Sequence, residues 1–132
     1  TGFVVGEDEI DLNVAATTGH TGGAYLEVTS NGGTLDTSAD GIVVADYNVA
    51  AASATISASD LYDAVSNGGD TAGNNTETIY VLVTTDATNA ADAFLFLATM
   101  NAGSNSFDAA VHVATLVGIT DVSAFTQSAD FV

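Results

Sequence analysis

The chain contains no lysine and no arginine, although aspartate and glutamate together number 17. The formal net charge is therefore −17, and no carboxylate can pair with a lysine or arginine of its own chain. Because like charges oppose compaction, cations, salt, partner chains or wide spacing must relieve the repulsion. The same lack argues against nucleic acid as a direct partner and against an anionic membrane surface, since both are held by basic side chains.

Cysteine, proline and long apolar runs are also missing. Without cysteine there are no disulfides, so cysteine usage says nothing about the compartment. Without proline, the turns depend on the 13 glycines and on Asn and Asp. The longest apolar run, Ala93–Met100, is far shorter than the ~20 residues that span a bilayer, which argues against membrane insertion. The chain starts at Thr1 without a signal segment, which indicates a processed end or an excised domain.

What is present suits a folded domain. Apolar residues make up 47% of the chain and charged residues only 13%, which is unlike an acidic disordered tail. A length of 132 residues suits one domain with a sizeable core, so residues 1–132 are expected to form a single β-rich domain.

Short runs rich in Val, Ile, Thr, Tyr and Phe alternate with turn-forming clusters, as in β-proteins. A helix near residues 58–66 is indicated by Ser57 and Asp60, which resemble a capping box, and by the Asn67–Gly69 stop signal. The expected fold is all-β or β-dominated, a sandwich or stacked β-hairpins with this one short helix. The predicted strands are Ala24–Thr29, Gly41–Tyr47, Thr78–Thr84, Ala93–Thr99 and Ala110–Val117.

Two parts of the chain repeat the order strand, glycine-containing turn, strand. Residues 24–44 and 93–113 are therefore predicted to be two similar β-hairpins, from a duplication or from convergent patterning. Two uncharged runs, Ile79–Val83 and Phe94–Leu97, fit either the core or a surface that pairs with a neighbouring subunit.

The densest acidic cluster lies near the N-terminus. In an extended segment Glu7, Glu9 and Asp11 project to one side, where they could bind Ca²⁺ or form a solvated strand edge. Further carboxylates lie in oxygen-rich turns, where they either bind Ca²⁺ or serve turn geometry alone. The candidate Ca²⁺ ligands are Glu7, Glu9, Asp11, Asp36, Asp40 and Asp70.

No enzyme motif is apparent. His20 lies in a glycine-rich turn and His112 in a predicted strand, and no HxH, HxxxH or HExxH spacing supports a zinc or iron centre. There is no GxSxG elbow, and nothing marks a cleft that holds paired carboxylates. We therefore expect no catalytic activity.

Segments near both ends resemble the C-terminal regions of bacterial RTX-type proteins, which are calcium-associated and exported by type I systems. Gly2–Leu12 is similar to the family segment F-x-x-G-x-D-x-I-D-L, and Phe125–Val132 resembles its L-T-x-x-D-F ending. Between them, the runs Ala93–Leu97, Asn105–Asp108 and Val113–Ile119 are similar to its closing hairpin. The resemblance implies a bacterial extracellular or cell-surface domain that folds where Ca²⁺ is plentiful. The repeat G-G-x-G-x-D is absent, so the family's calcium sites cannot be transferred to this chain.

Together these features predict a non-enzymatic extracellular structural domain of a bacterial surface or fibre protein. It would self-associate through β-strands, with its charge balanced by Ca²⁺ or salt. The alternative is a monomeric C-terminal secretion and capping module of a larger RTX-type protein. A secreted hydrolase fragment would require two close carboxylates or a His–Ser pair in a cleft.

Overall fold

The computed structural model describes residues 4–12, 24–28, 40–49, 56–65, 78–85, 92–101, 106–119, 121–122 and 125. For residues 24–28, 40–49, 64, 65 and 85 it describes the backbone alone. Asp36, Asp70 and His20 lie outside the described residues. The elements are β1 (Ala24–Val28), β2 (Asp40–Val49), α1 (Ala58–Val65), β3 (Thr78–Thr85), β4 (Asp92–Met100) and β5 (Phe107–Val117). The prediction of a β-dominated fold with one short helix is confirmed.

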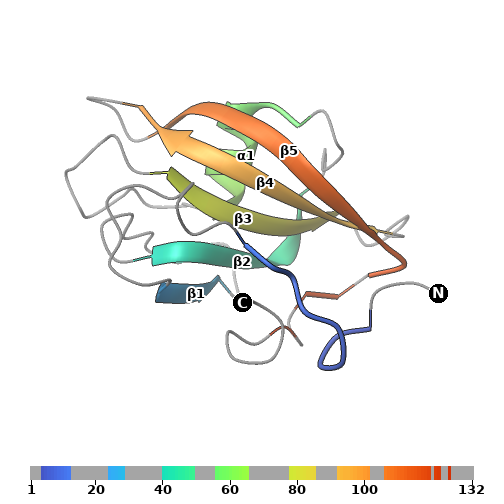
Figure 1. Cartoon of the computed structure of the whole chain (residues 1–132). Helices are drawn as coiled ribbons and strands as arrows, with labels where there is room; N and C mark the ends of the chain where they lie inside the picture. Colours follow the sequence, from blue (N-terminus) through green and yellow to red (C-terminus); the bar gives the residue numbers. More distant parts are fainter. Residues whose placement is uncertain are drawn as a thin grey trace.

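The five strands form one sheet in the order β1-β2-β3-β4-β5 (Figure 1). β1 pairs with β2, and β2 with β3, in parallel, whereas β3, β4 and β5 are joined antiparallel. Within the described residues the strands therefore form a single mixed sheet, and not the two packed sheets of a sandwich.

Of the two predicted hairpins, one is present. β4 and β5 form the antiparallel hairpin expected of residues 93–113. The hairpin expected of residues 24–44 is wrong, because β1 and β2 are parallel. A glycine-containing connection between two strands indicates that the chain turns, but a connection of this length can also cross over to a parallel strand. Turn composition alone could not distinguish the two.

Helix α1 begins at the predicted capping box. The Ser57 hydroxyl accepts a hydrogen bond from the Asp60 backbone N–H at 3.1 Å and donates one to the Asp60 carboxylate at 2.6 Å. This satisfies an N–H group that would otherwise lack a partner at the helix start. The apolar stripe of the helix then turns toward the sheet, and Leu61 is completely buried.

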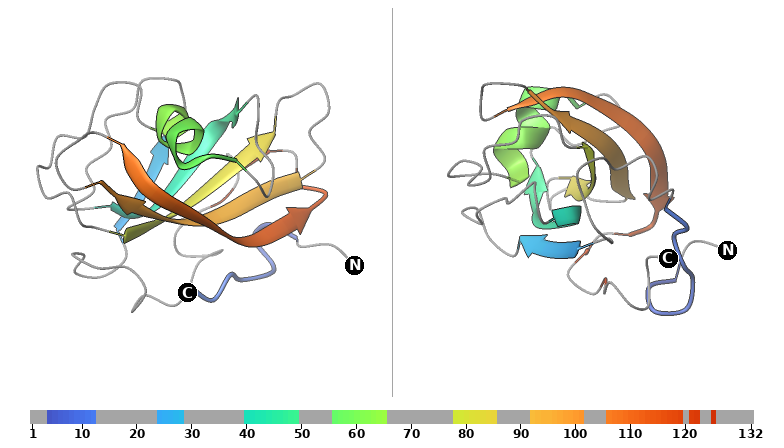
Figure 2. Two further views of the ribbon diagram at one scale, coloured as in Figure 1. Left: turned by 90° about the horizontal axis from the view of Figure 1, so that it is seen from above. Right: turned by 60° about the vertical axis from the view of Figure 1, so that its left-hand side comes forward.

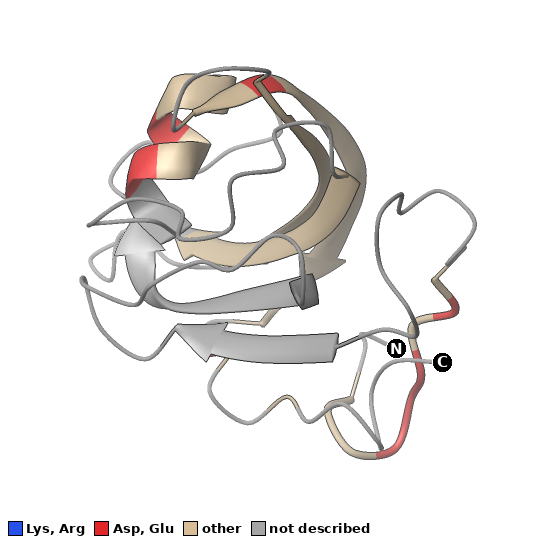
Figure 3. Cartoon of the chain, turned by 90° about the vertical axis from the view of Figure 1, so that its left-hand side faces the viewer, with Lys and Arg blue, Asp and Glu red and all other residues tan. Residues whose placement is uncertain are grey.

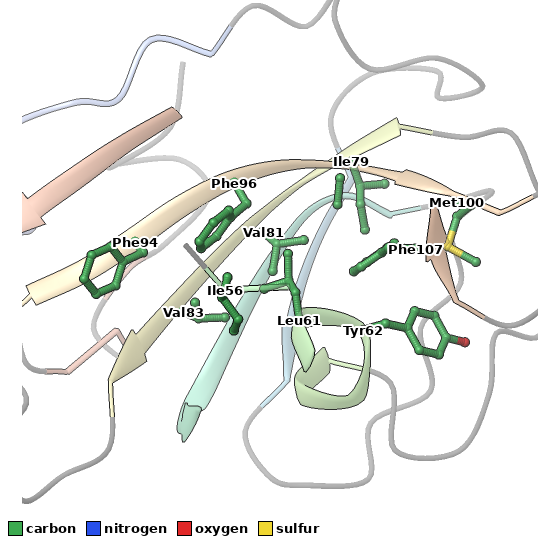
Figure 4. Packing of buried hydrophobic residues seen from close by; sticks show 11 residues of the cluster. Ile56, Leu61, Tyr62, Ile79, Val81, Val83, Phe94, Phe96, Met100 and Phe107 are labelled. Carbon is green, nitrogen blue, oxygen red and sulfur yellow. The ribbon is translucent and has the colours of Figure 1, made fainter. Parts of the chain in front are cut away.

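The sheet is curved, and α1 packs against its concave face (Figures 2 and 3). The helix contacts both β2 and β5, so it spans the hollow of the sheet between these strands. The concave face carries one continuous apolar cluster, shown in Figure 4. Its buried members are Ile56, Leu61, Tyr62, Ile79, Val81, Val83, Phe94, Phe96, Ala98, Met100 and Phe107.

The convex face of the sheet carries a second apolar cluster. Tyr80 and Leu82 of β3 and Leu95 of β4 alternate with the concave-face residues, as the period of a strand requires. Segments near the two ends of the chain cover this face; their buried members are Leu12, Ile119, Val122 and Phe125. Because β3 and β4 are covered on both faces, their central runs Ile79–Val83 and Ala93–Ala98 contain no charged or strongly polar residue. Among the described residues no helix is long and apolar enough to cross a membrane.

Candidate functional site

The acidic N-terminal segment is a turn followed by an extended stretch. The backbone N–H groups of Glu7 and Asp8 donate to the Val4 carbonyl at 3.1 and 2.9 Å, and the Asp8 carboxylate accepts from the Val4 N–H at 2.8 Å. Gly6 occupies the left-handed region at φ 81°, which glycine adopts without strain. The expectation of an extended segment is therefore wrong at Glu7, because the Asp8 carboxylate stabilises a turn.

From Glu9 onward the segment follows the predicted alternation. Glu9 and Asp11 are exposed, whereas Ile10 and Leu12 pack against the convex-face cluster. The carboxylates of this segment therefore point to solvent, and the apolar residues between them hold the segment to the sheet.

The described residues contain no group of three or more Asp, Glu, His or Cys side chains that could hold a metal ion. Glu7, Glu9 and Asp11 are thus not brought together into such a group. Asp40 is the first residue of β2, where the backbone alone is described. Ca²⁺ binding by the six candidate residues stays a prediction.

His112 is part of the concave side of the sheet. It pairs across the ladder with Phe96, and its ring lies 5.6 Å from the Phe96 ring and 6.1 Å from the Phe94 ring, centroid to centroid. Its Nε2 is 3.0 Å from the Thr115 hydroxyl, within hydrogen-bond distance. The half-buried imidazole therefore extends the aromatic packing of β4 onto β5, and the Thr115 hydroxyl satisfies one imidazole nitrogen.

The two strands considered for subunit pairing, Ile79–Val83 and Phe94–Leu97, are core strands. β3 and β4 each have a neighbour on both sides, and Ile79, Val81 and Phe96 are buried. The core interpretation of these runs is correct, so neither run offers a free edge to a partner.

β5 is one of the two edge strands of the sheet that the described residues form, and it is the edge strand whose side chains are described. Three valines of this strand are well exposed: Val111 at 60%, Val113 at 50% and Val117 at 67%. No carboxylate occurs between Asp108 and the end of β5 at Val117. We call the open side of this strand, with its three valines, the β5 edge. Figure 3 shows red, carboxylate-bearing segments on α1, on the N-terminal segment and near one end of β5.

A hydrogen bond defines where β5 ends. The Gly118 N–H donates to the Asp92 carboxylate at 3.0 Å, and Gly118 turns the chain with φ 85°. Asp92 pairs with Val117 at the last rung of the ladder, so the carboxylate stops the strand where the pairing stops.

The sequence did not reveal that β5 would be an edge strand. Ala110–Val117 was expected to be a strand, but strand patterning does not report which strand lacks a neighbour. The available signal was the interruption of the β5 run by His112, Ala114 and Thr115, in contrast to the unbroken apolar run Ala93–Ala98 of β4.

No protein-family model, curated protein or solved structure matches this chain.

Proposed function

We propose that this chain is a non-enzymatic structural domain of a bacterial extracellular or cell-surface protein, and that copies of it associate along the β5 edge. The observation that carries the proposal is the edge itself, a strand of 11 residues that ends the sheet and exposes three valines. An edge strand presents unpaired backbone N–H and C=O groups, which another strand can satisfy.

The protections that usually keep edge strands apart are weak along this strand. Edges are commonly guarded by charged side chains, by proline or by being short. From Ala109 to Val117 β5 has no Asp, Glu, Lys, Arg or Pro, although the chain carries 17 carboxylates elsewhere. An exposed uncharged strand on a strongly charged protein favours specific pairing at that strand.

Charge sets the conditions for association. Two copies at −17 each repel one another, and salt or Ca²⁺ would reduce that repulsion. Surface carboxylates such as Glu9 and Asp11 are available to solvent cations. We therefore expect association to strengthen with ionic strength and with millimolar Ca²⁺.

The extracellular, RTX-like and type I secretion parts of the proposal rest on composition and on the motifs near both ends of the chain. The described parts of these ends, residues 4–12 and Phe125, both contribute to the convex-face cluster. They behave as parts of one packed unit, as a terminal domain of a larger secreted protein would require.

Sedimentation velocity of the purified chain at low and high salt, with and without Ca²⁺, tests the proposal. The variant Val111→Lys places a charge on the β5 edge and is expected to weaken association at least about tenfold, equivalent to ~1.4 kcal/mol. The matched control is Val4→Lys, which adds the same charge at a valine that is 47% exposed and remote from β5 in sequence.

A chain that stays monomeric under every condition would overturn the proposal and favour a monomeric secretion module. Equal weakening by the two lysine variants would also contradict it, because the effect would then come from net charge and not from the edge.

A further inference from the structure

β5 is not a uniform strand: its pairing with β4 is irregular at Asp108 and at Val113, and only the second irregularity lies within Ala109–Val117. Residues 109–112 pair with residues 99–96 of β4, and residues 114–117 pair with residues 95–92. Val113 lies between these runs and has no partner position on β4, which is the pattern of a β-bulge. The bulge at Val113 therefore divides Ala109–Val117 into two paired runs of equal length.

The bulge also exchanges the faces of the strand. Before it, Val111 pairs with Leu97 on the convex face; after it, Ala114 pairs with Leu95 on the same face. Side chains alternate along a regular strand, so residues 111 and 114 share a face only because Val113 is extra. A strand that pairs with the open side of β5 must accommodate this change of face at Val113.

We infer that two copies pair antiparallel along β5, about a two-fold axis at the level of His112 and Val113. This inference rests on the self-association proposed above. This register places Val111 opposite Ala114 of the second copy, Ala110 opposite Thr115 and Ala109 opposite Leu116. The two residues of each pair lie on the same face of the sheet, which is required of residues directly opposite each other on neighbouring strands. A regular partner strand would leave one residue of Ala109–Val117 unmatched, as β4 does, whereas a second copy brings its own extra residue to the same place.

The position of Asp108 supports this orientation. Asp108 is the only carboxylate of β5, and the antiparallel register puts the two copies of it at opposite ends of the paired segment. Their separation is about eight strand positions, roughly 26 Å at ~3.3 Å per residue, which is about three Debye lengths at physiological salt. An in-register parallel pair would instead place the two Asp108 carboxylates side by side, where like charges destabilise a sheet.

The result is a closed dimer whose sheet runs through both copies, because an isologous two-fold contact uses the same edge twice. The opposite edge of each sheet is β1, which spans only 5 residues. Growth beyond the dimer would need this short edge, so the β5 contact by itself stops at two copies.

Disulfide trapping tests the register, and the absence of cysteine makes each introduced thiol unique. Directly opposite residues of an antiparallel pair have Cα atoms about 4.5–5.5 Å apart, within the range that a disulfide spans. Ala109→Cys and Leu116→Cys are expected to crosslink when the two variants are mixed. Neither is expected to crosslink alone, because two copies of residue 109 lie roughly 20 Å apart in this register.

The other possible results contradict either the proposed register or self-association itself. Crosslinking of Ala109→Cys with itself would indicate parallel pairing and overturn the inference. Association by sedimentation without a mixed crosslink would also overturn it, while leaving self-association intact. A monomeric chain under all conditions would remove both proposals.

Discussion

Tyr62 offers a test in which a conservative change should stabilise the protein. Its side chain is only 5% exposed, and its ring packs edge-on against Phe107, with centroids 5.2 Å apart and planes at 89°. The hydroxyl is buried and has no hydrogen-bond partner among the residues that the structure describes. Figure 4 shows the hydroxyl pointing away from the rest of the cluster. A buried hydroxyl without a partner loses its hydration and gains nothing in return.

Tyr62→Phe removes this hydroxyl and keeps the ring. A buried unsatisfied polar group costs about 1–3 kcal/mol, and the contact between the ring and Phe107 is unaffected. We expect the variant to raise the free energy of unfolding by at least about 1 kcal/mol. For a chain of 132 residues this corresponds to a melting temperature roughly 3–4 °C higher. Most substitutions in a core lower stability, so the sign of the change is itself the test.

Urea unfolding followed by far-ultraviolet circular dichroism, at one fixed ionic strength, measures the difference. The matched control is Tyr80→Phe, which deletes the same atom from an equally buried tyrosine on the convex face. Tyr80 takes part in an interaction within the fold, so its variant is expected to be neutral or to lose up to about 1 kcal/mol. A loss of more than about 1 kcal/mol for Tyr62→Phe would refute the reasoning, because it would mean that the hydroxyl has a partner.

Four further predictions concern stability. Ser57→Ala removes the cap of α1 and should cost about 1 kcal/mol, whereas the exposed Ser59→Ala should be close to neutral; chemical unfolding compares them. Leu61→Ala empties a completely buried site under the concave face and should cost about 2–5 kcal/mol by the same measurement. Gly118→Ala meets no neighbouring atom within 4 Å, so its cost of about 1 kcal/mol should come from the left-handed backbone alone, and thermal unfolding should show the loss. Added NaCl should raise the melting temperature of the wild-type chain, because 17 carboxylates repel without any basic residue; a salt-independent melting temperature would contradict this.

The local elements followed from local signals. The helix was predicted near residues 58–66 and spans Ala58–Val65, because the Ser57–Asp60 capping box and the following glycines act over a few neighbouring residues. β4 was predicted over Ala93–Thr99 and spans Asp92–Met100, since an uncharged apolar run with two phenylalanines between turns has few alternatives. Such signals need no knowledge of the rest of the fold.

Pairing was harder to predict. The motif of strand, turn and strand occurs at both residues 24–44 and residues 93–113, yet one pair is parallel and the other antiparallel. Both arrangements satisfy the same backbone groups, so the choice depends on which strands bury which faces. The turn at Glu7 was missed for a related reason: the Asp8 carboxylate reaches back to the Val4 N–H, an interaction that strand periodicity does not encode.

The candidate site illustrates the same division. The sequence identified carboxylates and uncharged strands, and it could not rank them, because exposure is a property of the assembled sheet. Only the strand order showed that Ile79–Val83 is interior and that Val111, Val113 and Val117 lie at an edge. The extra residue at Val113, which carries the pairing register, is likewise defined only against its neighbour β4.

By itself, the sequence determined the chemical character of this protein: an acidic chain without basic residues, an apolar content sufficient for a core, and the positions of its strands and helix. These properties are additive over residues or act between close neighbours. The tertiary structure alone decided the strand directions, the packing of α1 against the curved sheet, and which strands lie at the edges of the sheet. Those depend on contacts between distant segments, where many arrangements share the same local pattern and only the total burial separates them.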